Sequence, residues 1–289
     1  MLNHEQIEAL QSFQPKLIFF DIDGTLLNTE GNYSAHLEQQ LQRLHSQGVK
    51  LAVASGRPAI AAQFLFDRLP LTSAGLFCTG TELYEPKNKK HLQLHLLNSS
   101  DLSQLYGVVK NQALYCEFYT PDFYTFDPSI ATSQPDHNDI NQIHSQHLRI
   151  PSTPMTAEQV LQQELPITKL LLGVNQKKQG DSLHALVEAF PQLEFAFAHF
   201  LARPDWLFAS VIPKTADKNT GFDTLLKYHQ ISAEEVAAFG DSHSDTVFLQ
   251  RAGLGIAMGN ASEVVKKTAN ISTLTADNDG VAVALQYFN

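Results

Sequence analysis

The stretch KLIFFDIDGTLL at residues 16–27 decides the fold. Its apolar part ends in two aspartates and Gly24, a pattern that is typical of a buried strand in a parallel sheet. Side chains two residues apart on a strand point the same way, so Asp21 and Asp23 are expected to lie close together. Two buried like charges are costly unless a cation or a proton accompanies them. The stretch therefore predicts a Mg²⁺ site at the end of this strand.

Strand and helix patterns alternate on both sides of this stretch. Ser34 can cap a helix over residues 34–47, and further apolar runs follow at 49–55 and 75–79. Near the C-terminus the pattern predicts strands at 236–240, 255–258 and 271–275, and helices at 220–228, 246–252, 262–269 and 280–288. This alternation predicts an α/β fold with a Rossmann-like parallel sheet and right-handed crossovers.

The middle of the chain has a different pattern. Aromatic-rich strands are expected at 113–120 and 122–126, followed by a polar stretch at 133–157 that is partly loop. A strand at 167–174, a helix at 182–190 and a strand at 193–198 come next. We therefore expect an inserted α/β domain at residues 83–211, with residues 1–82 and 212–289 together forming the core domain.

Composition excludes several classes of protein. With 20 basic and 30 acidic residues the formal charge is −10, and no basic cluster is present, so neither nucleic acid nor an anionic membrane is an expected partner. The cysteines, Cys78 and Cys116, are too few for a disulfide framework or a zinc site. The N-terminus lacks signal-peptide features, and the apolar runs are too short to span a membrane. The sequence predicts a soluble, cytoplasmic monomer or homodimer.

Further chemistry-bearing residues follow other predicted strands. Ser55 and Gly56 come between a strand and a helix, where a hydroxyl and backbone N–H groups can bind phosphate, although Ser55 alone could be an ordinary helix cap. Asp241 and Asp245 follow the strand at 236–240 and add carboxylates for a hard cation. Lys218, placed 23 residues before Asp241, is suited to neutralising these carboxylates, whereas a single lysine is ordinarily solvated.

Five motifs in this order resemble one known family. They are DIDGTLL at 21–27, SGRP at 55–58, Lys218, GDSHSD at 240–245 and AMGNASEVVKKTA at 257–269. Together they resemble the haloacid dehalogenase superfamily, and in particular its Cof-like class IIB, which has a large α/β cap domain. The resemblance implies a Rossmann-like core that carries catalysis and an inserted cap that determines the substrate.

The resemblance also implies residue roles. Asp21 would be the nucleophile that forms an aspartyl-phosphate, and Asp23 the general acid and base. Mg²⁺ would be held by Asp21, the backbone carbonyl of Asp23, and Asp241. The remaining implied roles are phosphate binding by Ile22, Ser55, Gly56, Lys218 and Ser244, support by Asp245 and Asn260, and substrate specificity from His199 and Arg203.

Two positions depart from the family pattern. Ser244 and Thr79 stand where the family usually has asparagine. These departures concern the phosphate and cap-hinge surroundings, and they leave the carboxylates intact. The sequence predicts a Mg²⁺-dependent phosphatase of small phosphorylated metabolites, such as a sugar phosphate, a nucleotide or a cofactor phosphate. The alternatives are a phosphomutase or phosphotransferase on the same fold, and a non-catalytic phosphate-ligand-binding protein.

Overall fold

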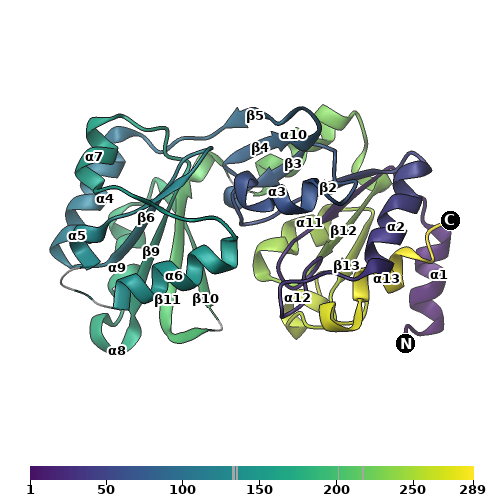
Figure 1. Cartoon of the computed structure of the whole chain (residues 1–289). Coiled ribbons are helices and arrows are strands. Elements are labelled where there is room, and N and C mark those ends of the chain that lie inside the picture. The colour runs from purple at the N-terminus through teal and green to yellow at the C-terminus, as the bar shows by residue number, and fades with distance from the viewer. Residues whose placement is uncertain (132–133, 135, 201, 217) are drawn as a thin grey trace. The chain divides into compact units, whose positions relative to one another are not determined.

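The computed structural model divides the chain into two compact units (Figure 1). It describes residues 1–131, 134, 136–200, 202–216 and 218–289. The first unit comprises residues 1–56, 62–92 and 218–289, and the second comprises 57–61 and 93–217. The predicted boundaries, 82/83 and 211/212, are therefore displaced to 92/93 and 217/218. The first shift arises because residues 82–92 continue the backbone pairing of the first unit.

The first unit is built on a five-stranded parallel sheet with the order β14-β13-β12-β1-β2. Its strands are β1 (Leu17–Phe20), β2 (Lys50–Val53), β12 (Val236–Gly240), β13 (Leu254–Ala257) and β14 (Ile271–Ser272). Its helices are α1 (His4–Ser12), α2 (Ala35–Ser46), α3 (Gln63–Phe66), α10 (Lys218–His229), α11 (Thr246–Arg251), α12 (Glu263–Lys266) and α13 (Gly280–Leu285). The predicted parallel α/β core is confirmed.

Local sequence explains the elements that frame this sheet. Every residue of β1 is buried, as expected for a central strand covered on both faces. The Ser34 side chain accepts a hydrogen bond from the Leu37 backbone N–H and so caps α2, as predicted. Leu37, Leu41 and Leu44 then form the buried stripe of α2.

The third predicted strand lies mostly outside the parallel sheet. β3 (Gly75–Phe77) pairs antiparallel with β4 (Glu82–Glu85), and β5 (Lys90–Leu94) completes a separate three-stranded sheet. The chain of β3 is linked to the end of β2 by an isolated parallel bridge between Leu76 and Ala54. The chain reverses after β3 because Cys78 and Thr79 adopt positive φ angles of 53° and 61°. Placing residues 75–79 within the parallel sheet was therefore only partly right.

The second unit carries a six-stranded sheet with the order β10-β11-β9-β6-β7-β8. Its strands are β6 (Tyr115–Tyr119), β7 (Tyr124–Phe126), β8 (Thr153–Pro154), β9 (Lys169–Asn175), β10 (Leu193–Phe200) and β11 (Arg203–Pro213). Its helices are α4 (Ser99–Asn111), α5 (Pro128–Ala131), α6 (Asp136–Leu148), α7 (Ala157–Gln162), α8 (Gln176–Gln179) and α9 (Ser182–Ala189). Side chains of α4, α7 and α9 share an apolar core with the sheet. Among the described residues, no helix is long and apolar enough to cross a membrane.

Helix α6 occupies much of the polar stretch at 133–157, in which loop was expected; residues 133 and 135 lie outside the described part of the chain. The inward positions of α6 hold His137, Ile140, His144 and Leu148. Two of these four are histidines, so a search for apolar residues at helical spacing finds only half of the stripe. His144 is accommodated because its Nδ1 lies 2.7 Å from Oε2 of the buried Glu117.

Candidate active site

Three neighbouring parallel strands end at one edge of the first unit's sheet. Asp21 follows β1, Ser55 follows β2 and Asp241 follows β12. The Asp21 backbone N–H donates to the Phe239 carbonyl at 3.0 Å, so Asp21 continues the pairing with β12. Because the carboxyl ends of parallel strands form the ligand-binding edge of open α/β sheets, this edge is the candidate site.

A tight turn carries the chain away from Asp21. The Leu27 N–H donates to the Ile22 carbonyl at 2.8 Å, and the Gly24 N–H donates to the Leu27 carbonyl at 3.0 Å. Gly24 has a φ of +74°, and a Cβ at this position would lie 2.5 Å from Oδ2 of Asp241. Glycine is therefore required both by the backbone conformation and by the approach of Asp241. The Ile22 side chain is fully buried, which leaves its backbone for any contact with phosphate.

Three carboxylates gather at this edge. Asp21, Asp241 and Asp245 each offer an oxygen, and these oxygens lie within 4.8 Å of one another. Burial, followed by the charge of Asp245, raises the pKa of Asp21 well above its usual value. The same two causes raise the pKa of Asp241 to about 6. Such a cluster of hard oxygen donors, in which ionisation is opposed by burial and like charge, fits a divalent cation such as Mg²⁺.

Lys218 supplies positive charge beside the carboxylates. It begins α10, is only 7% exposed, and donates from Nζ to Oδ1 of Asp245 at 2.8 Å and to the Ser244 hydroxyl at 3.0 Å. Burial acts to lower the pKa of Lys218, but the charges of Asp245 and Asp21 outweigh it and the net pKa is raised. Lys218 is thus a buried cation and not a solvated surface lysine.

Asp245 is held in place by its own hydrogen bonds. Its Oδ2 accepts from the Ser242 backbone N–H at 3.0 Å and from the Ser242 hydroxyl at 2.7 Å, while Oδ1 accepts from Lys218. Both oxygens are thereby engaged by protein donors. Asp245 differs from Asp21 and Asp241 in that its charge is paired directly with Lys218, and its supporting role stays a prediction.

Asp23 lies two residues beyond Asp21, where its backbone forms a bridge with Leu27. It is absent from the group of three clustered carboxylates. Its charge nevertheless contributes to the raised pKa values of both Asp21 and Asp241. Asp23 therefore lies near enough to act electrostatically on the same site.

Two polar side chains fix the orientation of Asp241. Asn260 donates from Nδ2 to Oδ2 of Asp241 at 3.1 Å and to the Gly24 carbonyl at 2.9 Å. Thr25 donates from its hydroxyl to Oδ1 of Asp241 at 3.2 Å. Asn260 was expected to support the site, whereas Thr25 was not singled out. The signal for Thr25 was its place in the DIDGT stretch.

The remaining phosphate-binding candidates follow the ends of β2 and β12. Ser55 is buried, and its N–H donates to the Leu76 carbonyl at 2.8 Å. A Cβ added at Gly56 would lie 3.7 Å from the hydroxyl oxygen of Thr79, which is an ordinary van der Waals distance. The hydroxyl of the exposed Ser244 accepts a hydrogen bond from Nζ of Lys218. Serine therefore still reaches the lysine, although its side chain is shorter than the asparagine usually found at this position.

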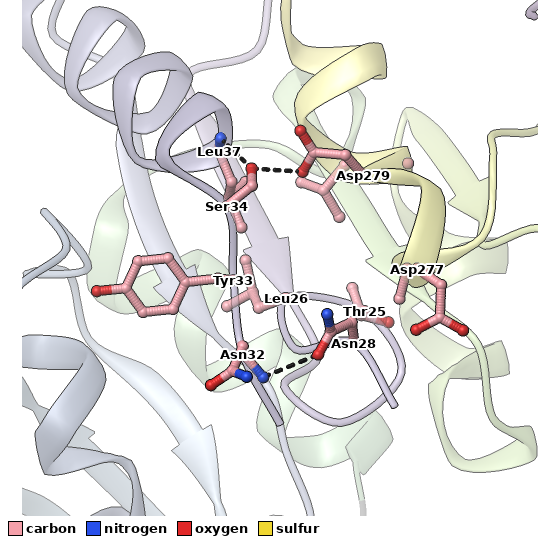
Figure 2. A pocket seen from close by; sticks show the side chains of 12 residues that line it. Thr25, Leu26, Asn28, Asn32, Tyr33, Ser34, Leu37, Asp277 and Asp279 are labelled. Atoms are coloured by element: carbon pink, nitrogen blue, oxygen red, sulfur yellow. Dashed lines mark hydrogen bonds between the residues drawn. The ribbon is translucent and has the colours of Figure 1, made fainter. Parts of the chain in front are cut away.

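A separate pocket of about 70 Å³ has Thr25 among its lining residues (Figure 2). It is lined by Thr25, Leu26, Asn28, Asn32, Tyr33, Ser34, Leu37, Ala276, Asp277, Asp279, Gly280 and Val281. Its polar groups bond to one another: Ser34 donates to Asp279 at 2.8 Å, and the Asn32 N–H donates to Asn28 at 2.9 Å. Asp21 and Asp241 do not line this pocket, so it is distinct from the carboxylate site.

The two residues expected to determine specificity lie on the β10–β11 hairpin of the second unit. Nδ1 of the exposed His199 lies 2.9 Å from the Trp206 carbonyl oxygen. Arg203 forms two hydrogen bonds with Asp205, at 3.1 and 3.2 Å, and its guanidinium lies over the Trp206 ring. Both side chains are thus engaged within their own unit, and their role with substrate stays a prediction.

Comparison with known proteins identifies the family. A family model described as haloacid dehalogenase-like hydrolase matches residues 18–285. The chain belongs to this family. Among curated relatives of this haloacid dehalogenase-like hydrolase, the 5-amino-6-(5-phospho-D-ribitylamino)uracil phosphatase YitU of Bacillus subtilis is 25% identical over 96% of this chain and 98% of its own.

Solved structures agree with this assignment. A haloacid dehalogenase-like hydrolase from Bacteroides thetaiotaomicron is 26% identical, with a TM-score of 0.81 over 96% of this chain and 100% of its own. A subclass IIB sugar phosphatase of the same superfamily, 24% identical, shares the fold with a TM-score of 0.77 over 94% of this chain and 98% of its own. The resemblance to the haloacid dehalogenase superfamily is confirmed, and the fold is shared with this subclass IIB structure.

Proposed function

We propose that the protein is a Mg²⁺-dependent phosphatase that hydrolyses small phosphate monoesters through an aspartyl-phosphate intermediate. The observation that carries the proposal is the largely buried group formed by Asp21, the half-buried Asp241 and Lys218 at the carboxyl edge of the parallel sheet. A site for phosphoryl transfer needs a positioned nucleophile and positive charge around the transferring group, and this arrangement offers both.

Asp21 and Asp241, with the backbone carbonyl of Asp23, are the proposed ligands of Mg²⁺. When bound, Mg²⁺ supplies positive charge that offsets the clustered carboxylates and the charge of the transferring phosphoryl group. Asn260 and Thr25 hold the Asp241 carboxylate through one hydrogen bond to each oxygen. These two hydrogen bonds orient the Asp241 carboxylate.

In the proposed reaction Asp21 attacks the phosphorus atom of the ester. An O–P bond to Asp21 forms while the bond between phosphorus and the leaving oxygen breaks, and Asp23 gives its proton to that oxygen. In the second step Asp23 takes a proton from water, whose oxygen attacks phosphorus and releases inorganic phosphate from Asp21. Asp23 thus serves once as acid and once as base, and both aspartates are regenerated.

The phosphoryl oxygens would be held by residues around the nucleophile. Lys218 provides a buried ammonium group, and Ser244 contacts the same Nζ. The backbone of Ile22 together with Ser55 and Gly56 completes the proposed phosphate contacts. Because Lys218 is anchored by Asp245, its charge is fixed in place before substrate arrives.

We assign catalysis to the first unit and selection of the leaving group to the second, with His199 and Arg203 as candidate specificity residues. The related YitU is named for a ribitylaminouracil phosphate and the related class IIB enzyme for sugar phosphates. A small phosphorylated metabolite is therefore the proposed substrate, and a panel of sugar phosphates, nucleotides and cofactor phosphates would identify it.

The first test is release of phosphate from p-nitrophenyl phosphate with Mg²⁺ or with a chelator. We expect turnover that requires Mg²⁺ and that is abolished in Asp21→Asn. Asp122→Asn, at an exposed position of the second unit, is the matched control and should retain wild-type turnover. Undiminished turnover by Asp21→Asn would refute the mechanism, whereas binding of phosphate esters without turnover would favour a non-catalytic binding protein.

A further inference from the structure

The sheet of the second unit ends in an open strand. β10 pairs with β11 along one side and is the terminal strand of the sheet, and no strand in the described part of the chain pairs with its other side (Figure 1). Open edges present unpaired N–H and C=O groups, and proteins usually protect them with charged side chains, above all lysine, with proline or with β-bulges. From Leu193 to Ala198 β10 contains no lysine or proline and a single charged residue, Glu194, and its one pairing irregularity lies beyond this segment, between Ala198 and Phe200.

An apolar patch lies beside this edge. Phe197 on β10 is 39% exposed and Val187 on α9 is 40% exposed, and they are two of the few large apolar side chains that are exposed in the described residues. The His184 ring stacks on Phe197 with centroids 4.7 Å apart. Since His184 and Val187 are three residues apart on α9, they lie on one face of that helix. The patch formed by Phe197, His184 and Val187 thus adjoins the unpaired backbone of β10.

We infer that β10 pairs antiparallel with β10 of a second copy of this chain, forming a two-fold symmetric dimer. The register that uses the exposed aromatic side chain places Phe197 opposite Phe195 of the second copy. Ala196 then faces Ala196 of the second copy across the two-fold axis. Residues directly opposite in an antiparallel pair share a face, so the symmetry creates two cross-strand aromatic pairs and leaves a small residue at the axis.

A second copy fits this edge better than a charged partner. The paired segment is apolar apart from Glu194, so it offers nothing to a polyanion or a polycation. A two-fold axis uses the Phe195–Phe197 pairing twice, and an interface of this kind closes at two copies. In the pairing, the outward backbone groups of both strands gain hydrogen bonds that water provides in the monomer.

Charge opposes the association at long range. Each copy carries a formal charge of −10, so two copies repel unless salt screens them. A strand edge with one helix face is also smaller than a standard interface, so we expect a weak, reversible dimer whose population rises with protein concentration. The dimer should therefore strengthen as salt concentration rises, which is opposite to an interface held by ion pairs.

Sedimentation velocity of the full chain, over a range of protein concentrations and at low and high salt, measures this equilibrium. We expect a monomer–dimer equilibrium that Phe197→Lys weakens by about tenfold or more, because the lysine places a charge in the aromatic pair. Val264→Lys is the matched control: Val264 is a 66% exposed residue of the first unit, and its substitution should leave the dimer unchanged. Unaltered circular dichroism and phosphatase activity would show that both variants are folded.

Disulfide crosslinking tests the register. Ala196→Cys should crosslink two copies under mild oxidation, because residue 196 faces its own counterpart, whereas Ala198→Cys, which faces Glu194 of the second copy, should not. The native thiols of Cys78 and Cys116 are buried and give no background. A chain that stays monomeric at all concentrations, a dimer insensitive to Phe197→Lys, equal crosslinking of both cysteine variants, or growth beyond two copies would each overturn the inference.

Discussion

Replacing Asp241 with asparagine should stabilise the metal-free protein. Burial and the charge of Asp245 raise the pKa of Asp241 from 3.8 to about 6. Because the folded-state pKa is the higher one, the folded state binds more protons than the unfolded state between these values. The free energy of unfolding therefore falls as pH rises from 3.8 to 6. Above pH 6 the folded protein carries the full cost of ionising Asp241 in its buried site.

The size of the effect follows from this shift. About two pKa units at ~1.4 kcal/mol each give a penalty of about 3 kcal/mol at neutral pH. The Asp241→Asn change removes this penalty but exchanges one carboxylate oxygen for an amide nitrogen. One of the two hydrogen bonds received from Asn260 and Thr25 is then lost, at ~1 kcal/mol. The net expectation is a gain of about 2 kcal/mol in the free energy of unfolding.

The assay is urea unfolding at pH 8 in the presence of a chelator, followed by circular dichroism because the single tryptophan, Trp206, belongs to the second unit. Mg²⁺ should then stabilise the wild type, since it binds the folded site, and should stabilise Asp241→Asn far less. Asp277→Asn is the control, because the pKa of Asp277 is lowered by hydrogen bonds from Thr29 and its substitution should bring no gain. A variant that is less stable than the wild type without metal, or that Mg²⁺ stabilises equally, would refute the reasoning.

Three further predictions concern other parts of the chain. Thr79→Asn should raise the free energy of unfolding by ~1 kcal/mol in a urea titration, because Thr79 has a φ of +61° and asparagine tolerates this left-handed conformation better; a loss of stability would contradict this. Burial lowers the pKa of His137 from 6.5 to about 4, so the stability of the second unit should fall by about 3 kcal/mol as pH drops from 6.5 to 4. Trp206 fluorescence reports this because its ring lies 5.7 Å from that of His137, and a pH dependence that persists in His137→Phe would exclude this cause. Lys218→Met should lower kcat for p-nitrophenyl phosphate by about 10²–10³-fold, and a smaller change than tenfold would show that the buried charge is not used.

The sequence was most informative where burial is complete. β1 and β12 were predicted because every residue in them is buried, so their apolar runs are uninterrupted. The motif order then located the carboxylates at the ends of these strands, and the fold and family predictions are confirmed. The catalytic and binding roles of the individual residues stay predictions, which the experiments above address.

Other features depend on tertiary contacts that no local pattern shows. Helix α6 was missed because His137 and His144 occupy inward positions that apolar residues usually fill, and His144 is paired with Glu117 from a distant strand. The burial of Lys218 is not visible in the local sequence, and the Asp245 carboxylate with which it pairs lies 27 residues further along the chain. The first domain boundary lies further along the chain than predicted, because β4 pairs with β3 and so belongs to the first unit.

Trapping of phosphorylated Asp21 tests the proposed mechanism most directly. A single-turnover reaction with excess enzyme, Mg²⁺ and a phosphate ester, quenched in acid, should yield the peptide containing residues 21–27 with one added phosphoryl group on Asp21. With p-nitrophenyl phosphate, whose leaving group departs without a proton from Asp23, the Asp23→Asn variant should accumulate this species, because the base that activates water for its hydrolysis is missing. Phosphate release with no phosphorylated peptide in either protein, or with the phosphoryl group on another residue, would contradict the assignment of Asp21 as nucleophile.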